Sequence, residues 1–176
     1  MLSCKKMPDI IKEPFRTEAV LNRFLGYSIT NAVADDESRD YCAFSFDMNG
    51  RKILFRSAKI TPKKSGQFVT LWKREGSSPI MPINSKDAVD FVVISVCAGS
   101  DYGLFVFPKP VLVAKGVFKS ELKAGKRAMR VYPEWDDTSN RQAKSTQLWQ
   151  LQYFINLTDG VGTDINRLKM LFDLGL

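Results

Sequence analysis

The sequence contains no histidine, and this absence excludes several kinds of active site. A Ser-His-Asp triad, a Cys-His pair and most zinc sites need an imidazole. Catalysis in this chain would have to use carboxylates, lysine or a hard metal ion. We therefore assign no certain cofactor, and Mg²⁺ or Mn²⁺ is the cofactor that a catalytic function would require.

Cysteines and long apolar runs are also scarce. The three cysteines, Cys4, Cys42 and Cys97, have neither the even number of a disulfide framework nor a metal-ligand spacing. No apolar run approaches the roughly 18 residues of a membrane span, and residues 1–10 lack the apolar segment of a signal peptide. We expect a cytoplasmic protein that contacts no membrane, with one domain over residues 1–176.

Acidic residues are missing from one long segment. Arg51 to Arg74 contains eight lysines and arginines and no acid, so the rest of the chain sums to −1 although the total is +7. A second segment, Lys109 to Arg130, sums to +6. Such concentrated charge predicts a polyanionic partner, most often nucleic acid, with DNA and RNA equally open. The alternative is two solvated basic hairpins.

The apolar patterns predict strands at the centre of the chain and helices towards its ends. Asn49-Gly50 lies between YCAFSFDM and RKILFRSAK and predicts a hairpin with a type I′ turn. Further strands are expected at residues 66–74, 89–98, 101–107 and 126–133. Helices are expected at residues 15–26, at 140–157 and after Thr163. This order predicts an α/β fold, a central mixed β-sheet flanked by helices.

The helix expected at 140–157 combines an apolar stripe with a polar face. Its apolar stripe consists of Leu148, Leu151, Phe154 and Ile155. Its polar face consists of Lys144, Gln147 and Gln150. Glutamines on a helix can read base edges, but more often they are helix formers that face solvent. We expect the glutamines to face solvent.

The hairpin register predicts one candidate metal site. A two-residue turn places Asp40 opposite Lys59 on the face that carries the apolar pairs. Metal-dependent nucleases place an Asp on one strand and Glu-x-Lys on the next, so that two carboxylates hold Mg²⁺. Here Ser57 stands where the Glu would be, and Glu18, Glu37 or Asp36 could supply the missing carboxylate. The alternative is an ordinary exposed ion pair.

The two basic segments supply the candidate phosphate contacts. The loop from Thr61 to Gly66 presents lysines but lacks the Walker spacing, which excludes an ordinary P-loop. The candidates for nucleic-acid binding are Arg56, Lys59, Lys63, Lys64, Gln67, Trp72, Lys73, Arg74, Lys126, Arg127 and Arg130. For Trp72 the alternative is a place in the core, and for residues 126–130 it is an edge strand protected by charge.

Four strings give the chain a family resemblance. FRSAKITPKKSGQFVTLWKR, FVFPK, GKRAMRVYPEWD and AKSTQLWQLQYF, in this order, resemble the MepB family over roughly residues 41–154. The resemblance implies a cytosolic bacterial protein with a restriction-endonuclease-like fold of the PD-(D/E)XK kind. It implies no established reaction.

Together these observations predict a nucleic-acid-binding protein of the MepB family with a degenerate endonuclease-like site. One alternative is a Mg²⁺- or Mn²⁺-dependent nuclease that uses Asp40, Lys59 and an acid from elsewhere, with Glu18 as one candidate. Another alternative is a sensor that binds a small anion or a nucleotide in the same basic cleft.

Overall fold

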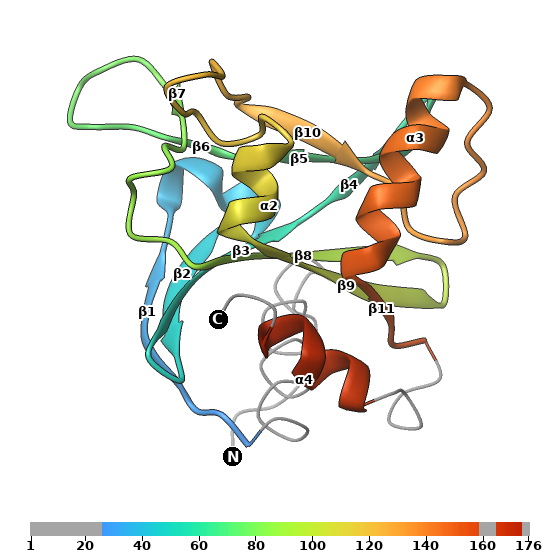
Figure 1. Cartoon of the computed structure of the whole chain (residues 1–176), viewed down its shortest axis with the longest axis horizontal. Helices are drawn as coiled ribbons and strands as arrows, with labels where there is room; N and C mark the ends of the chain where they lie inside the picture. The colour runs from blue at the N-terminus through green and yellow to red at the C-terminus, as the bar shows by residue number, and fades with distance from the viewer. Residues whose placement is uncertain (1–25, 159–164, 174–176) are drawn as a thin grey trace.

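A six-stranded mixed β-sheet forms the centre of the computed structural model, which describes residues 26–158 and 165–173 (Figure 1). In spatial order its strands are β1 (Ile29–Ala34), β2 (Phe44–Met48), β3 (Arg51–Ser57), β8 (Phe91–Ala98), β9 (Asp101–Pro108) and β11 (Phe154–Asn156). β3 and β8 run parallel, and every other neighbouring pair is antiparallel. The predicted α/β fold with a central mixed sheet is confirmed.

β2 and β3 form the hairpin that Asn49-Gly50 predicts. Phe44 faces Phe55 and Phe46 faces Ile53, which is the predicted register. The φ angles of Asn49 and Gly50 are 48° and 73°, the left-handed backbone that a type I′ turn needs at both positions. The turn residues therefore fixed which side chains face each other across the hairpin.

The hairpin is shorter than predicted, and this changes the position of Asp40. Asp40 lies in a 3-10 helix, η1 (Asp36–Tyr41), and not in a strand. Asp35 caps η1 by accepting a hydrogen bond from the Glu37 N–H, and Cys42 ends it in the left-handed region with φ 44°. The strand therefore begins only at Phe44, two residues after this cap.

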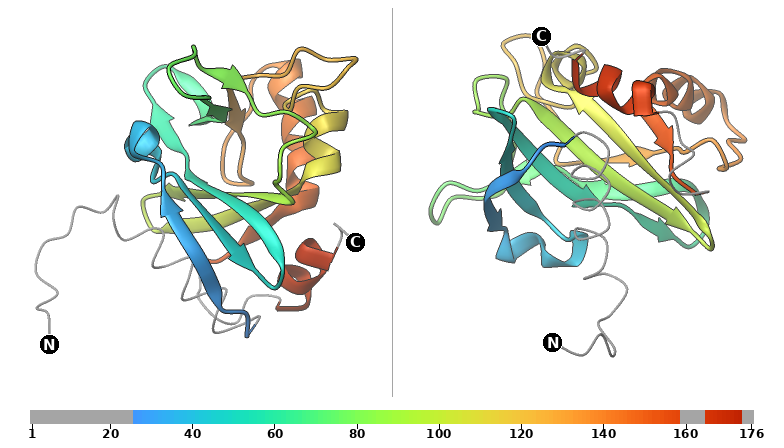
Figure 2. Two further views of the ribbon diagram at one scale, coloured as in Figure 1. Left: turned by 90° about the vertical axis from the view of Figure 1, so that its left-hand side faces the viewer. Right: turned by 90° about the horizontal axis from the view of Figure 1, so that it is seen from below.

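Both faces of the central sheet are covered, as the continuous apolar run of β8 predicts. On one face α4 (Ile165–Asp173) buries Leu168, Leu171 and Phe172, and the Phe172 ring lies 5.4 Å from that of Phe91. On the other face the core is closed by a second sheet, by α2 (Lys109–Ala114) and by α3 (Arg141–Gln150). Figure 2 shows α4 on one side of the central strands and the second sheet on the other.

The second sheet is small and carries the basic segments. It contains β4 (Lys59–Thr61), β5 (Lys64–Thr70) and β10 (Ala128–Val131), with β5 in the middle. The chain leaves β5 into β6 (Trp72–Lys73), which pairs only with β7 (Met81–Pro82). Residues 66–74, expected as one strand, are thus divided between two sheets. Leu71, between the two strands, is buried in the core like Gln67 and Val69 of β5.

The predicted helix at 140–157 is wrong at its C-terminal end. α3 stops at Gln150, a 3-10 turn η2 covers Leu151–Tyr153, and β11 follows. Phe154 and the next residue, Ile155, are buried in the cores on opposite faces of the sheet. Only a strand sends consecutive side chains to opposite faces. Leu148, expected in the core, is 71% exposed.

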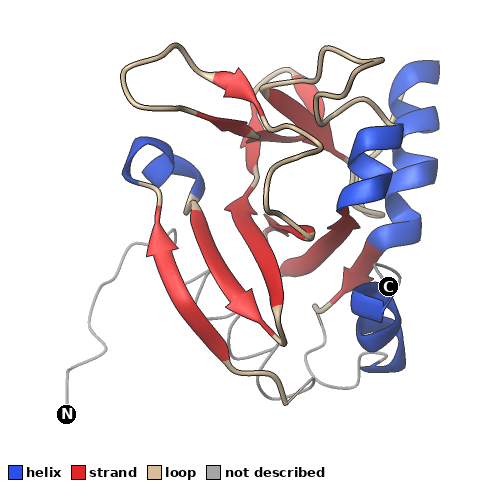
Figure 3. Cartoon of the chain, turned by 60° about the vertical axis from the view of Figure 1, so that its left-hand side comes forward, coloured by secondary structure: helices blue, strands red, loops and turns tan. Residues whose placement is uncertain are grey.

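α2 was not anticipated from the sequence. It follows β9 directly, with Pro110 in its first turn, and Leu112 anchors it in the core. Figure 3 shows α2, α3 and α4 gathered on one side of the molecule and η1 on the other. In residues 26–158 and 165–173, no helix combines the length and the apolar character needed to span a bilayer.

Candidate nucleic-acid interface

The outer face of the second sheet carries a row of cations and aromatics. The strand register aligns Lys59 of β4, Phe68 of β5 and Arg130 of β10, and all three side chains are half-buried. The Arg130 guanidinium carbon lies 5.8 Å from the centre of the Phe68 ring. Lys59 Nζ lies 4.7 Å from the centre of the Tyr41 ring, which η1 brings against the edge of Phe68. The rings of Tyr41 and Phe68 therefore help to hold the charged groups of Lys59 and Arg130 in place on the outer face of the second sheet.

Arg130 is held in place without being neutralised. Its guanidinium donates hydrogen bonds to the Gly66 carbonyl at 2.8 Å, to the Ser65 carbonyl at 3.3 Å and to Thr61 Oγ1 at 2.7 Å. Gly66 has φ 77°, and a Cβ at this position would collide with the Tyr132 ring. The glycine therefore lets the β4–β5 hairpin approach β10 closely enough to orient Arg130.

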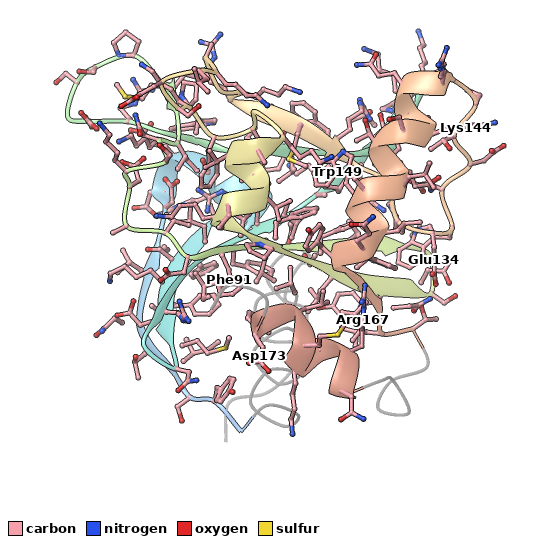
Figure 4. The ribbon with its side chains drawn as sticks, in the orientation of Figure 1. Phe91, Glu134, Lys144, Trp149, Arg167 and Asp173 are labelled. Atoms are coloured by element: carbon pink, nitrogen blue, oxygen red, sulfur yellow. The ribbon has the colours of Figure 1, made fainter. Side chains whose placement is uncertain are left out.

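A groove runs beside this row, between β10 and α3. It has a volume of about 420 Å³, and its lining includes Lys115, Lys126 and Arg130 but no aspartate or glutamate. Lys115 Nζ lies 5.3 Å from the centre of the Trp149 ring. Figure 4 shows Trp149 on the side of α3 that faces α2 and Lys144 on the opposite side. We call this space the β10–α3 groove.

Two glutamines of α3 fix the shape of the groove. Gln150 is fully buried; its side chain accepts a hydrogen bond from the Tyr132 N–H at 2.9 Å and donates one to the Arg130 carbonyl at 2.9 Å. Gln147 donates to the carbonyls of Pro133 and Asp136, both at 3.0 Å. The expectation that these glutamines face solvent is wrong, because Gln150 pairs with the open edge of β10 and Gln147 with the loop that follows β10.

The predicted phosphate contacts divide into two groups. Lys63, Lys64, Lys126 and Arg127 are exposed, and none forms an ion pair within residues 26–158 and 165–173. Together with Lys59 and Arg130 they lie on or beside the outer face of the second sheet. We call these six residues the basic surface, and that they act together in binding stays a prediction.

The other predicted contacts lie elsewhere. Arg56 is 3% exposed and Gln67 is buried, with its side chain donating to the Cys97 carbonyl at 3.1 Å. Trp72, Lys73 and Arg74 line a separate cleft beside β1 and β3. These five residues face the core or that cleft because β3 and β5 alternate their side chains and because β6 leaves the second sheet.

Acids from other segments pair with several of the basic residues. Lys73 Nζ lies 2.7 Å from carboxylates of both Asp87 and Glu75, and Arg74 Nε lies 2.8 Å from Glu37. The hydrogen bonds that Lys73 donates to Asp87 and Glu75 raise the pKa of Lys73. The segment from Arg51 to Arg74 contains no acid, but some of its cations still form ion pairs. Folding brings acids from outside the segment next to them.

Asp40 and Lys59 lie close together as predicted, but Asp40 belongs to η1 and not to a strand of the hairpin. Lys59 Nζ lies 3.7 Å from Asp40 Oδ2, and the Asp40 side chain is 88% exposed. Glu18 lies outside the described residues. Among the residues that are described, no group of three potential ligands is placed to hold a metal ion. A single exposed carboxylate does not fit Mg²⁺ or Mn²⁺, which need several oxygen ligands.

Asp136 is a partly buried carboxylate behind the basic surface. Burial raises its pKa, and a hydrogen bond from the Gly66 N–H opposes part of that rise. A raised pKa means that the folded protein binds the proton more tightly, so this group lowers stability as pH rises from the ordinary aspartate pKa to the raised one.

We therefore expect Asp136→Asn to melt at pH 7 at a temperature at least equal to that of the unmodified protein. The amide oxygen can still accept from Gly66, while the penalty for burying a charge is removed. The advantage of the variant should shrink at about pH 2.5, below the ordinary aspartate pKa, where the carboxyl is protonated in both the folded and the unfolded state. Thermal unfolding at both pH values measures this, and a variant that is less stable at pH 7 would contradict it.

Two solved structures match the chain, and a family model matches most of it. The family model, described as MepB-like, covers residues 35–156. The crystal structure of MepB is 31% identical, covers 80% of this chain and 96% of its own, and superposes with a TM-score of 0.71. The bacterial homing endonuclease I-Ssp6803I is 17% identical, with 80% and 90% coverage and a TM-score of 0.45, which is too low to support an argument. No curated protein matches.

Proposed function

We propose that this chain, which belongs to the MepB-like family, binds nucleic acid through the outer face of its second sheet and the adjoining β10–α3 groove. Lys63 and Lys64 at one end of the second sheet and Lys126 at the other would contribute exposed charges that contact phosphates. Arg130, already oriented by carbonyl oxygens, would contribute a fixed charge between them. Phosphate contacts of this kind supply most of the affinity of non-specific nucleic-acid binding.

One observation carries this proposal: the β10–α3 groove holds three cations and no carboxylate. The cleft beside β1 and β3 differs, because its lining contains four acids. A bound polyanion repels carboxylates and favours a surface from which they are absent. The groove also shares Arg130 with the cation–aromatic row, so the two basic features form one continuous surface.

The aromatic residues of this face orient cations and do not stack bases. Phe68 and Tyr41 are half-buried, and each already has a cation over or beside its ring. Contacts to phosphates therefore carry the proposed affinity. Binding that depends on phosphates is tolerant of sequence and strongly dependent on salt.

The test is fluorescence anisotropy of labelled duplex DNA, single-stranded DNA and RNA, titrated with protein over a salt series without metal. Engagement of Lys63, Lys64, Lys126 and Arg130 predicts a slope of log affinity against log salt of about −3 to −4 for duplex and about −2 to −3 for a single strand. No binding to any polymer at low salt would overturn the proposal. Saturable binding of a mononucleotide without polymer binding would support the small-anion alternative instead.

We also expect no cleavage when Mg²⁺ or Mn²⁺ is added to these complexes, because Asp40 alone does not fit a divalent metal site. Asp40→Ala removes the acid beside Lys59 and should leave the affinity unchanged or slightly higher. Gel analysis of the incubated oligonucleotides measures cleavage. Metal-dependent cleavage that is lost in Asp40→Ala would show that the nuclease alternative is correct.

A further inference from the structure

A second cleft lies apart from the proposed nucleic-acid surface, between β1–β3 and β6. Its volume is about 440 Å³, within the range of small-molecule sites. We call it the Arg56 cleft, and its lining includes Val33, Phe44, Leu54, Arg56, Trp72 and Val89. A neighbouring hollow of about 390 Å³ shares Val33, Leu54 and Val89 with it and continues along the same strands.

Arg56 is the one charged residue in the described part of the chain that is buried, with 3% of its surface exposed. Its guanidinium donates to the Phe55 carbonyl at 2.8 Å and approaches Asp35 at 3.4 Å. Arg56 Nε is buried without a hydrogen-bond partner. Burial lowers the pKa of Arg56, and the charge of Asp35 offsets this only in part. A buried guanidinium with one distant carboxylate is poorly compensated.

Asp35 is not a dedicated counter-ion for this arginine. Asp35 Oδ1 accepts the N-terminal hydrogen bond of η1 from the Glu37 N–H at 3.2 Å. Only Oδ2 is directed to Arg56, and the Asp35 side chain is 36% exposed. Arg56 therefore retains donors that an additional anion could satisfy.

The other two cations of the Arg56 cleft are already engaged. Lys73 contacts two carboxylates at 2.7 Å. Arg74 donates to Glu37 at 2.8 Å and to the Ser78 carbonyl at 2.7 Å. Arg56 is thus the cation of this cleft whose charge is least balanced by nearby carboxylates, and it is also the most buried of the three.

The remaining lining defines what kind of anion fits. Apolar side chains such as Leu54 and Val89 and the half-buried ring of Trp72 favour a ligand with an apolar body. Asp36, Glu37 and Asp87 also line the cleft and would repel a polyanion. Both features argue against a nucleic-acid strand and against free inorganic phosphate.

We propose that the Arg56 cleft binds a small organic anion with a single acidic head group and a flat apolar body. The head group, a carboxylate or a phosphate, contacts the Arg56 guanidinium, and the body lies against Trp72 and Leu54. This site is separate from the nucleic-acid surface and does not depend on the function proposed for it.

Matched pairs of probes test the site on the full chain by saturation-transfer NMR. Indole-3-acetate is compared with indole-3-acetamide, and adenosine monophosphate with adenosine. We expect one of the two anions to saturate the protein at millimolar concentration or below and its neutral partner to bind at least about 10-fold more weakly. The pair that shows this difference identifies the head group as carboxylate or phosphate. Failure of both anions to bind would overturn the proposal.

Two variants assign the binding to this cleft. Arg56→Met removes the charge with little change in volume and should abolish the difference between the anion and its neutral partner. Ala88→Trp places a large side chain at an exposed position of the lining and should block the anion even if Arg56→Met does not fold. Undiminished binding to Ala88→Trp would overturn the proposal. Both folded variants should bind nucleic acid like the unmodified protein, so the two proposals can fail separately.

Discussion

Replacing Lys63, Lys64 and Lys126 together by glutamine should lower nucleic-acid affinity roughly 100-fold near physiological salt. These side chains are exposed and form no ion pairs within the described part of the chain, so their loss should leave the fold intact. Removing three phosphate contacts should also reduce the salt slope by about 2 to 3, depending on whether the polymer is single- or double-stranded. Anisotropy titrations at several salt concentrations measure both quantities.

The control, matched in net charge, replaces Lys52, Lys86 and Lys169 by glutamine, although Lys52 and Lys86 form ion pairs with Asp47 and Glu121. This variant loses the same net charge from exposed positions on β3, on the segment after β7 and on α4. If binding depends on the local surface, the control should lose much less affinity than the first variant and keep its salt slope. Equal losses in the two variants would show that net charge alone drives binding and would contradict the proposed surface.

The second large effect concerns Gln150. Gln150→Leu should lower the free energy of unfolding by about 2–5 kcal/mol, because it leaves the Tyr132 N–H and the Arg130 carbonyl buried without their partner. Leucine fills a similar volume, so the loss reports mainly the two hydrogen bonds. Urea denaturation, with the unfolding slope compared between proteins, measures the change.

Gln142→Leu is the control on the same helix. Gln142 is exposed and lines the β10–α3 groove, and none of the hydrogen bonds found in residues 26–158 and 165–173 uses its side chain. Its replacement should change stability by no more than about 0.5 kcal/mol. If Gln150→Leu changed the free energy of unfolding as little as this control, the hydrogen bonds between α3 and the edge of β10 would not be what stabilises the groove.

The parts of the fold that follow local rules could be predicted from the sequence. Asn49-Gly50 defined a turn, and with it the register of the hairpin. The apolar run of β8 indicated a strand covered on both faces. The end of α3 could not be predicted, because Phe154 and Ile155 fit a helical stripe as well as a strand over so short a stretch. Their burial on opposite faces of the sheet decided between the two.

The candidate site was harder to predict because its geometry depends on distant segments. The sequence identified the basic residues, but pairing acids such as Glu37 and Asp87 reach Arg74 and Lys73 only in the folded chain. The burial of Arg56 follows from the position of β3 beside β8 and the packing above it. The β10–α3 groove has no local signal, since Lys115 and Trp149 meet across two helices.

The most direct test of the central claim is photo-cross-linking of the tightest-binding oligonucleotide, followed by mass spectrometry of the digested protein. Binding at the proposed surface predicts cross-linked peptides from β5, from residues 126–131 and from the first half of α3, all of which border the outer face of the second sheet or the β10–α3 groove. Cross-links confined to β1, β2 or α4, on other surfaces of the molecule, would contradict it.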